Sequence, residues 1–213
     1  MVQGGDLFPS TGRSPIAFAG SLAWLVDMAP TPDEVPSLEP PPPWTHPDWR
    51  NSELWPVPDD RDVDLNRVGG PAWIDTAGRA ARGLLNESAS PLVVGHGDWY
   101  TGNLRWAGDR LHVVWDWDSM VALPEAVVAG LAAAVYPANG EGTEATIEES
   151  EAFLAAYQTA RGRIFSDEER RVAWAAGLWN RSFDAKKQFA TDGEPRSLSE
   201  SEATERQRRT RNG

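Results

Sequence analysis

A proline-rich stretch at residues 29–60 constrains the fold more than any other feature of this chain. It includes four consecutive prolines, Pro40 to Pro43, and it is interspersed with three tryptophans, Trp44, Trp49 and Trp55. Because proline fixes its φ angle and lacks an amide proton, such a stretch can form neither a helix nor a central strand. One interpretation is a polyproline ligand for a partner domain. We favour an irregular segment that its tryptophans hold against the domain surface.

Size and charge narrow the class of protein. The 213 residues are 40% hydrophobic, which suffices for one domain with a real core. The formal net charge of −12 argues against a nucleic-acid partner. It is compatible with a cationic small-molecule substrate, although a negative charge also keeps many proteins soluble. The oligomeric state stays open.

Two absences in the sequence exclude further classes. The chain has no cysteine, so disulfides, cysteine-bound zinc and thiol catalysis are ruled out. The apolar run at residues 16–26 is too short to span a bilayer, and no basic region precedes it. We therefore expect no membrane partner and a cytoplasmic location.

Hydrophobic spacing and capping signals predict the elements around the proline-rich stretch. We expect a loosely ordered N-terminus at 1–17, a helix at 18–28 and a second helix from Pro71 to about 86. Further helices are expected from Pro124 to about 136, from the capping box Thr146–Glu149 to about 160, and from a second box, Ser166–Glu169. Residues 191–213 are polar, and we expect a disordered tail there.

Strands are predicted only in the middle of the chain. Residues 92–94 form a short apolar run that indicates a buried strand. Residues 104–106 and 111–115 predict a hairpin, whose turn contains Gly108 where φ can be positive. The predicted class is α+β: a mostly helical body at 18–190 that carries a small hairpin.

The loop between the first strand and the hairpin combines groups that suit phosphate chemistry. It reads HGDWYTGN from His96 to Asn103, so Asn103 follows Asp98 by five residues. A carboxylate at a strand end can accept a proton from a substrate hydroxyl. The hairpin returns Asp116 beside Asn103, and one aspartate with one asparagine suits Mg²⁺, which takes its other ligands from water and substrate phosphates. This layout is typical of phosphoryl transfer.

Other interpretations of this region remain. Aspartate and asparagine are common in turns, and Asp109 is best explained as a turn residue. A metal-dependent hydrolase that uses Asp98 and Asp116 is less favoured, because neither a second histidine nor a carboxylate-bridged metal pair is visible. For His96 we predict an orienting role: a hydrogen bond to the backbone near Asp116, without contact to substrate.

Residues 92–123 resemble the catalytic core of the aminoglycoside phosphotransferase and choline kinase superfamily, whose small-molecule kinases are related to protein kinases. The resemblance rests on HGDxxxxN and on Val114-Trp115-Asp116-Trp117-Asp118. It implies that Asp98 is the catalytic base and that Asn103 and Asp116 are magnesium ligands. It also implies a protein-kinase-like C-terminal lobe over 18–190, with ATP as the phosphate donor.

The resemblance further implies which acidic groups line an acceptor pocket, and it exposes one departure. Candidates to face the substrate are Asp118, Glu125 and Asp184. Family members carry an N-terminal lobe with a phosphate-contacting lysine, yet no lysine precedes Lys186 here. We therefore expect this ATP-binding lobe to be missing. The two leading hypotheses are a truncated phosphotransferase that acts on a small-molecule hydroxyl, and a non-catalytic remnant that only binds small molecules.

Overall fold

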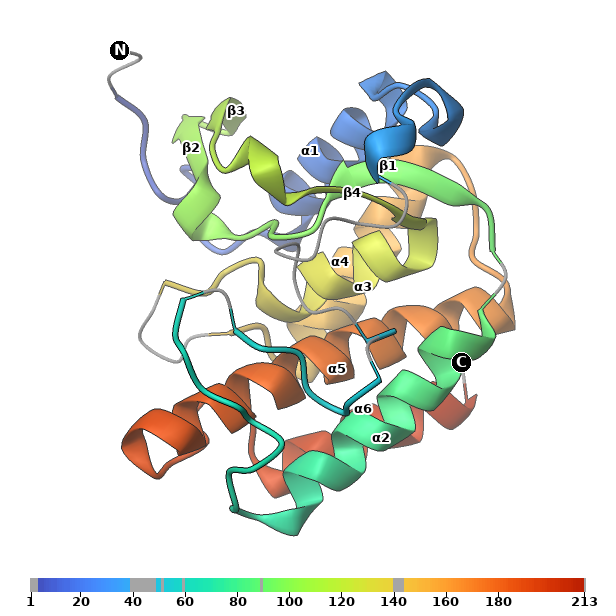
Figure 1. Ribbon diagram of the computed structural model, residues 1–213. Helices are drawn as coiled ribbons and strands as arrows, with labels where there is room; N and C mark the ends of the chain where they lie inside the picture. The colour runs from blue at the N-terminus through green and yellow to red at the C-terminus, as the bar shows by residue number, and fades with distance from the viewer. Residues whose placement is uncertain are drawn as a thin grey trace.

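The computed structural model describes residues 4–38, 49–50, 52–58, 60–88, 90–139 and 144–212. Within these ranges the chain has α+β architecture, with six α-helices and two small antiparallel sheets (Figure 1). This confirms the predicted class and the predominance of helix. The helices are α1 (Pro15–Met28), α2 (Ala72–Glu87), α3 (Glu125–Val135), α4 (Ile147–Arg161), α5 (Asp167–Asp192) and α6 (Glu200–Asn212).

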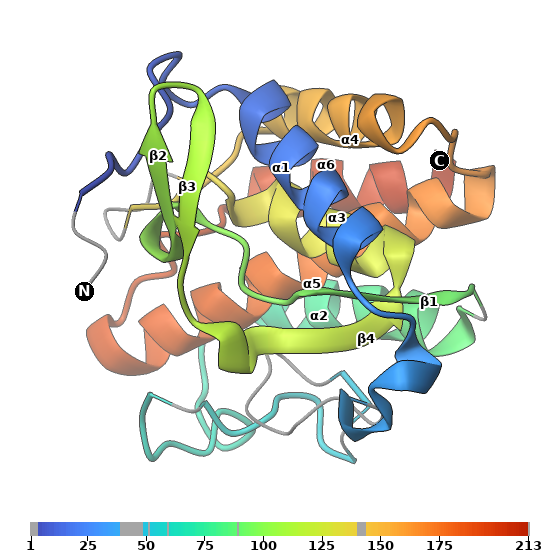
Figure 2. The same ribbon diagram turned by 90° about the horizontal axis from the view of Figure 1, so that it is seen from above.

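Each sheet has two strands. Strands β2 (Leu104–Ala107) and β3 (Arg110–Val114) form the predicted hairpin, and its turn residue Gly108 has φ +63°. Strand β1 (Leu92–His96) pairs with β4 (Met120–Pro124), with His96 opposite Met120 (Figure 2). Strand β4 is not predicted from the sequence. The β1–β4 pair brings the two ends of the segment containing the loop and the hairpin together.

Both capping boxes form as predicted. Thr146 and Ser166 each accept a hydrogen bond from the amide of the glutamate three residues later, and each glutamate bonds back to its cap. Helix α4 ends at Gly162, whose left-handed conformation, φ +63°, glycine adopts without strain. Helix α5 buries the four apolar residues expected on its inner face, Val172, Ala176, Trp179 and Phe183.

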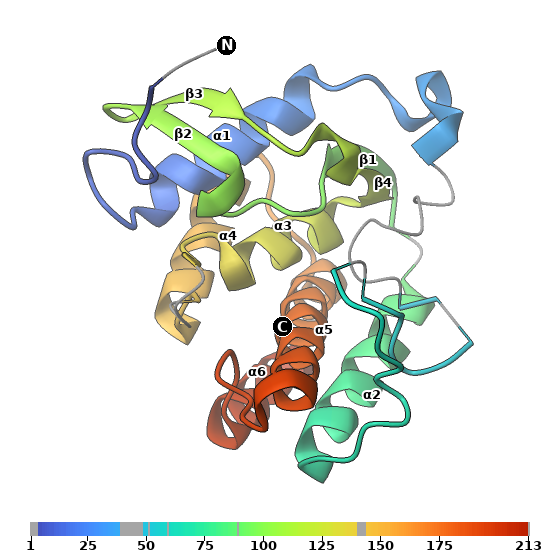
Figure 3. The same ribbon diagram turned by 60° about the vertical axis from the view of Figure 1, so that its left-hand side comes forward.

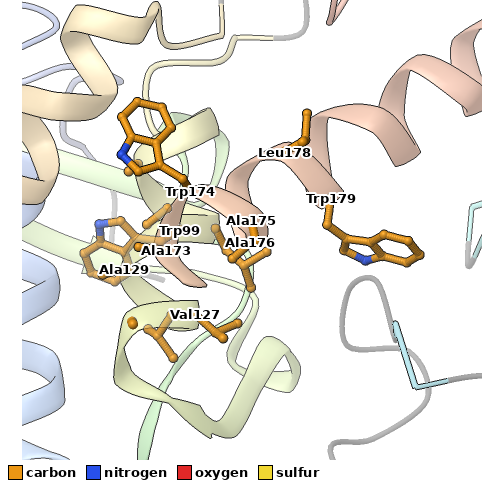
Figure 4. Packing of buried hydrophobic residues seen from close by; sticks show 14 of the residues in the cluster. Trp99, Val127, Ala129, Ala173, Trp174, Ala175, Ala176, Leu178 and Trp179 are labelled. Atoms are coloured by element: carbon orange, nitrogen blue, oxygen red, sulfur yellow. The ribbon is translucent and has the colours of Figure 1, made fainter. Parts of the chain in front are cut away.

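Helices α3 and α5 pack against each other in the core, to which both contribute mainly small side chains such as Ala129, Ala173 and Ala176 (Figure 4). The crossing is close because it occurs at glycines. A Cβ atom on Gly130 would lie 2.1 Å from the carbonyl oxygen of Ala173, and one on Gly177 would lie 3.0 Å from the Cβ of Ala134. Helix α3 supports β1 in turn, since Gly95 packs directly on Val128.

The prediction of a disordered C-terminal tail is wrong for residues 200–212, which form helix α6 against α5 and α2 (Figure 3). Its inner face is built from Ala203, Arg206 and Thr210, all buried. Arg206 donates to Glu202 Oε1 at 2.8 Å and to the carbonyl of Ala145 at 2.7 Å. The sequence does not predict this helix because the segment has low hydropathy. The buried contacts of α6 are made largely by Arg206, whose charge is paired.

The N-terminus is better ordered than the sequence indicates. Helix α1 begins three residues earlier than expected, at Pro15. Asp6 exchanges two backbone hydrogen bonds with Trp106 of β2, each of 2.9 Å. Ser10 Oγ and the Thr11 amide both donate to Asp109 Oδ1 in the hairpin turn. Residues 6–11 are therefore fastened to the hairpin by pairing that composition does not reveal.

The proline-rich stretch is irregular where the structure describes it, with short 3₁₀ turns at Pro32–Glu34 and Pro36–Leu38. Trp49 and Trp55 are buried, and Trp55 stacks on Trp179 at a centroid distance of 5.2 Å. These tryptophans therefore hold the segment on the domain, as the favoured interpretation predicted. Trp44 and Pro40 to Pro43 lie outside the described residues.

Candidate functional site

Strand β1 ends at His96 and leads directly into the loop that contains Asp98. Buried side chains anchor this loop to the neighbouring elements. The indole of Trp99 is buried and donates to the carbonyl of Phe18 in α1 at 3.2 Å. Thr101 is also buried: its amide donates to the carbonyl of Tyr136 and its hydroxyl to that of Leu7. The loop is thus held by α1, the end of α3 and the N-terminus, and Asp98 and Asn103 stay half-buried at its surface.

The structure joins Asp98 and Asn103 directly. The Asn103 side-chain Nδ2 donates to Asp98 Oδ2 at 2.8 Å and to the Asp98 carbonyl at 3.0 Å. Because the amide nitrogen is committed to Asp98, the amide oxygen on the other side of the group is the atom that can bind a cation. The same bond holds the Asp98 carboxylate in position. The two residues for which the sequence predicts the roles of base and metal ligand therefore lie in direct contact.

Asp116 stands at the end of β3 in an unusual backbone conformation. It is the one non-glycine residue with positive φ in the part of the chain that the structure describes, at φ 62° and ψ 48°. Such left-handed residues cost free energy and cluster at functional sites. The preceding amide, that of Trp115, donates to the Asn103 carbonyl at 2.8 Å, and Ser119 Oγ donates to Asp116 Oδ2 at 2.6 Å. The hairpin therefore returns Asp116 to Asn103, with one carboxylate oxygen already oriented.

His96 connects the two halves of this arrangement. Its buried ring lies with Nε2 3.0 Å from the carbonyl oxygen of Trp115, while Nδ1 accepts from the Asp98 amide at 3.2 Å. The ring is thus a neutral tautomer that carries its proton on Nε2. Burial lowers the pKa of His96 and outweighs the neighbouring carbonyl and carboxylates, which favour the charged form. The backbone contact predicted from the sequence is the one the imidazole makes.

Tyr100 belongs to the site but is not predicted from the sequence. Its ring lies over Gly102, where a Cβ atom would approach the phenol oxygen to 2.4 Å. Burial raises the pKa of Tyr100, and the negative charges of Asp98 and Asp116 raise it further, so the hydroxyl keeps its proton. The signal in the sequence is the glycine two residues later, which leaves room for the ring.

The three acidic substrate candidates differ in their surroundings. Asp118 is exposed in the short turn Trp117–Ser119 directly after Asp116, so the structure brings it to the edge of the site. Glu125 is instead buried in an ion network. Its Oε1 accepts from Tyr157 and Arg161, and its Oε2 accepts from Arg163 at 2.9 Å. Because both oxygens are committed, Glu125 has a structural role in place of the substrate-facing one expected.

Asp184 is half-buried on α5 in a mixed group of charges. Burial raises the pKa of Asp184 to about 6, and the opposing attraction of Lys187 and Arg181 does not compensate. Asp60 adds repulsion from a neighbouring segment. The role of Asp184 as a substrate contact remains a prediction.

The raised pKa of Asp184 predicts a pH-dependent gain in stability for Asp184→Asn. The folded pKa lies above the unfolded value of 3.8, so the ionised carboxylate destabilises the fold fully above pH 6, and this penalty disappears as the pH falls to about 4. We expect thermal unfolding to show a gain of about 2 kcal/mol at pH 8 and almost none at pH 4. Asp62→Asn, at an exposed position, is the control. An equal gain at both pH values would contradict this explanation.

Comparison with protein-family models and with curated proteins found no match for this chain. Among the residues that the structure describes, no helix has the length and hydrophobicity needed to cross a bilayer. Within the same residues, no three His, Cys, Asp or Glu side chains converge as a metal-binding group. A site with one aspartate and one asparagine ligand does not require such a group.

Proposed function

We propose that this chain carries the catalytic site of an ATP- and Mg²⁺-dependent phosphotransferase that acts on a hydroxyl of a small molecule. The observation that carries the proposal is the bond from Asn103 Nδ2 to Asp98 Oδ2, which orients a base and a metal ligand together. The strained Asp116, returned to Asn103 by the hairpin, supplies the second ligand. We also propose that the fold is the C-terminal lobe of a protein-kinase-like enzyme.

The residues of the site divide the work of phosphoryl transfer. Asp98 accepts the proton of the attacking hydroxyl, and its orientation is fixed by Asn103. Oδ1 of Asn103 and the carboxylate of Asp116 would hold Mg²⁺, a cation that prefers oxygen ligands. The bound cation would neutralise charge on the transferred phosphate. The Tyr100 hydroxyl, protonated beside both aspartates, can donate a hydrogen bond to the acceptor or to a phosphate oxygen.

Both lysines of the chain are engaged away from these residues. Lys186 is buried and forms an ion pair with Asp75 at 2.9 Å, and Lys187 pairs with Asp60 at 3.1 Å. Arg105, which follows the loop, donates to the carbonyls of Gly102 and Leu104. Neither lysine is therefore placed to contact the phosphates of ATP. In the proposal this chain contacts them through Mg²⁺ held by Asn103 and Asp116. This favours an enzyme that relies on a further lobe for tight ATP binding.

Calorimetry of ATP binding with and without Mg²⁺ tests the proposal. We expect heat of ATP binding only when Mg²⁺ is present, with a dissociation constant near the millimolar range. Asp116→Asn should weaken this binding at least about tenfold. Loss of a residue that only orients a metal ligand already reduces metal affinity by about that factor, and Asp116 is proposed to be a ligand itself. Asparagine tolerates the left-handed backbone, so the hairpin should survive the change. Asp109→Asn removes the same charge from the tip of the same hairpin and should leave binding unchanged.

Two outcomes would contradict parts of the proposal. If millimolar ATP gives no heat with Mg²⁺, this chain alone does not act as a kinase. If Mg·ATP binds but no ADP forms with a panel of hydroxyl-bearing acceptors, cationic amines included, the non-catalytic remnant becomes the better explanation. The net charge of −12 is the reason to include the amines.

A further inference from the structure

A groove of about 710 Å³ lies between the exposed face of α1 and strand β3. Its floor on α1 consists of the small residues Ala17, Gly20 and Ser21. Ile16 and Trp24 stand at its two ends, eight residues apart, which is about 12 Å along a helix. Ile16 is 72% exposed and Trp24 60% exposed. A floor of small residues between two large apolar side chains makes a flat slot.

The opposite wall of the groove is β3 and the turn that follows it. Leu111, Val113 and Val114 supply apolar surface, and Trp117, which is 57% exposed, also lines the groove. Exposed tryptophan rings favour stacking with flat aromatic molecules. The volume lies within the range of about 300–1,000 Å³ that is usual for small-molecule pockets.

The β3 side of the groove carries one carboxylate, that of Asp109, and one guanidinium, that of Arg110. Arg110 and His112 both line the groove. Arg110 pairs with Ala107 through its backbone, but within the described ranges its side chain makes no hydrogen bond or ion pair. Its neighbour Asp109 is held by Ser10 Oγ at 2.7 Å and by the Thr11 amide. The rim therefore offers one uncommitted guanidinium, with an imidazole two residues away.

We propose that this groove binds a flat aromatic or fused-ring molecule that carries one anionic group. The rings would occupy the slot above Gly20 and contact Trp24 and Trp117. The anion would pair with Arg110, which can form two parallel hydrogen bonds to a carboxylate or sulfonate. This site is independent of the phosphotransferase proposal, because none of its contacts requires Asp98, Asn103 or Asp116.

Two probes of opposite charge test the proposal on the full chain. Calorimetry should show naphthalene-1-sulfonate binding with one-to-one stoichiometry. 1-Naphthylmethylamine has the same rings and a positive charge, and it should bind at least about tenfold more weakly, the effect of one lost charged hydrogen bond. The net charge of −12 favours the amine everywhere else on the protein, so a preference for the sulfonate identifies Arg110. Arg110→Gln should reduce the affinity for the sulfonate about tenfold.

Gly20→Leu tests the slot itself. A Cβ atom on Gly20 meets nothing within 4 Å, so leucine fills the groove without a clash at its Cβ, and it also favours the helix. We expect binding of the sulfonate to be lost. Gly83→Leu is a matched control, because Gly83 lies within α2 and its Cβ would also meet open space. It should leave the affinity unchanged.

Three outcomes would overturn the proposal. The first is equal sulfonate affinity in Gly20→Leu and the unaltered chain. The second is tighter binding of the amine than of the sulfonate. The third is the absence of naphthalene binding together with a self-association that Gly20→Leu abolishes, which would assign the groove to a second copy of the chain.

Discussion

Asp98→Asn is expected to lower the rate of phosphoryl transfer by about 10²–10⁴-fold, the usual contribution of a positioned general base. Asparagine cannot accept the hydroxyl proton, but its side-chain oxygen can still accept the hydrogen bond from Asn103. The loop should therefore keep its shape, and Mg·ATP should bind with nearly unchanged affinity. The rate is measured as ADP formation with an acceptor that the unaltered chain uses, and the affinity by calorimetry.

Asp118→Asn is the matched control for this experiment. Asp118 also lies near the site and carries the same charge, but it follows Asp116 in an exposed turn. We expect Asp118→Asn to change the KM of a cationic acceptor and to leave kcat within about threefold. The Asp118 carboxylate would contact the acceptor equally in the ground state and in the transition state, so its loss would weaken binding without slowing the chemical step. Retained transfer in Asp98→Asn would remove Asp98 from the role of base.

Gly130→Ala is expected to destabilise the fold by about 3 kcal/mol or more, above the usual range for overpacking. The new methyl group would lie 2.1 Å from the carbonyl oxygen of Ala173 and 2.7 Å from its Cα, so the obstacle is backbone, which cannot rotate away. Helices α3 and α5 would have to separate, and β1 rests on α3 through Val128. Urea denaturation measures the loss as a lower midpoint.

Gly83→Ala provides the comparison. It places the same methyl group in open space on α2, where we expect a gain of up to about 1 kcal/mol from the better helix propensity of alanine. If both variants unfolded at the same urea concentration, the close crossing of α3 and α5 would not limit stability.

The fold could be predicted where local signals decide the structure. Thr146 and Ser166 with their glutamates, Gly162 and Gly108 each satisfy backbone groups within a few residues, so spacing alone locates them. Helix α6 and strand β4 depend on partners distant in sequence. Arg206 is buried because the carbonyl of Ala145, 61 residues earlier, accepts its hydrogen bond, and nothing local reveals that.

The candidate site divides in the same way. The spacing of Asp98 and Asn103 predicts a pair that one short loop brings together, and the structure joins them. The resemblance places Glu125 in the acceptor pocket, but the Glu125 carboxylate contacts Arg161 and Arg163, more than 30 residues later in the chain. Tyr100 could not be predicted as a site residue, because its importance depends on how its ring lies over Gly102.

At position 116 the left-handed backbone and the proposed cation make different demands on the residue type. Glycine and asparagine adopt this conformation with the least strain, whereas β-branched residues oppose it. A chain that kept the hairpin but no longer needed a cation could relax to glycine there, and the end of β3 would persist. An aspartate in this place accepts a conformational cost that glycine avoids. Under the proposed role of Asp116 as a metal ligand, the residue at 116 would distinguish chains that keep this site from chains that have lost it.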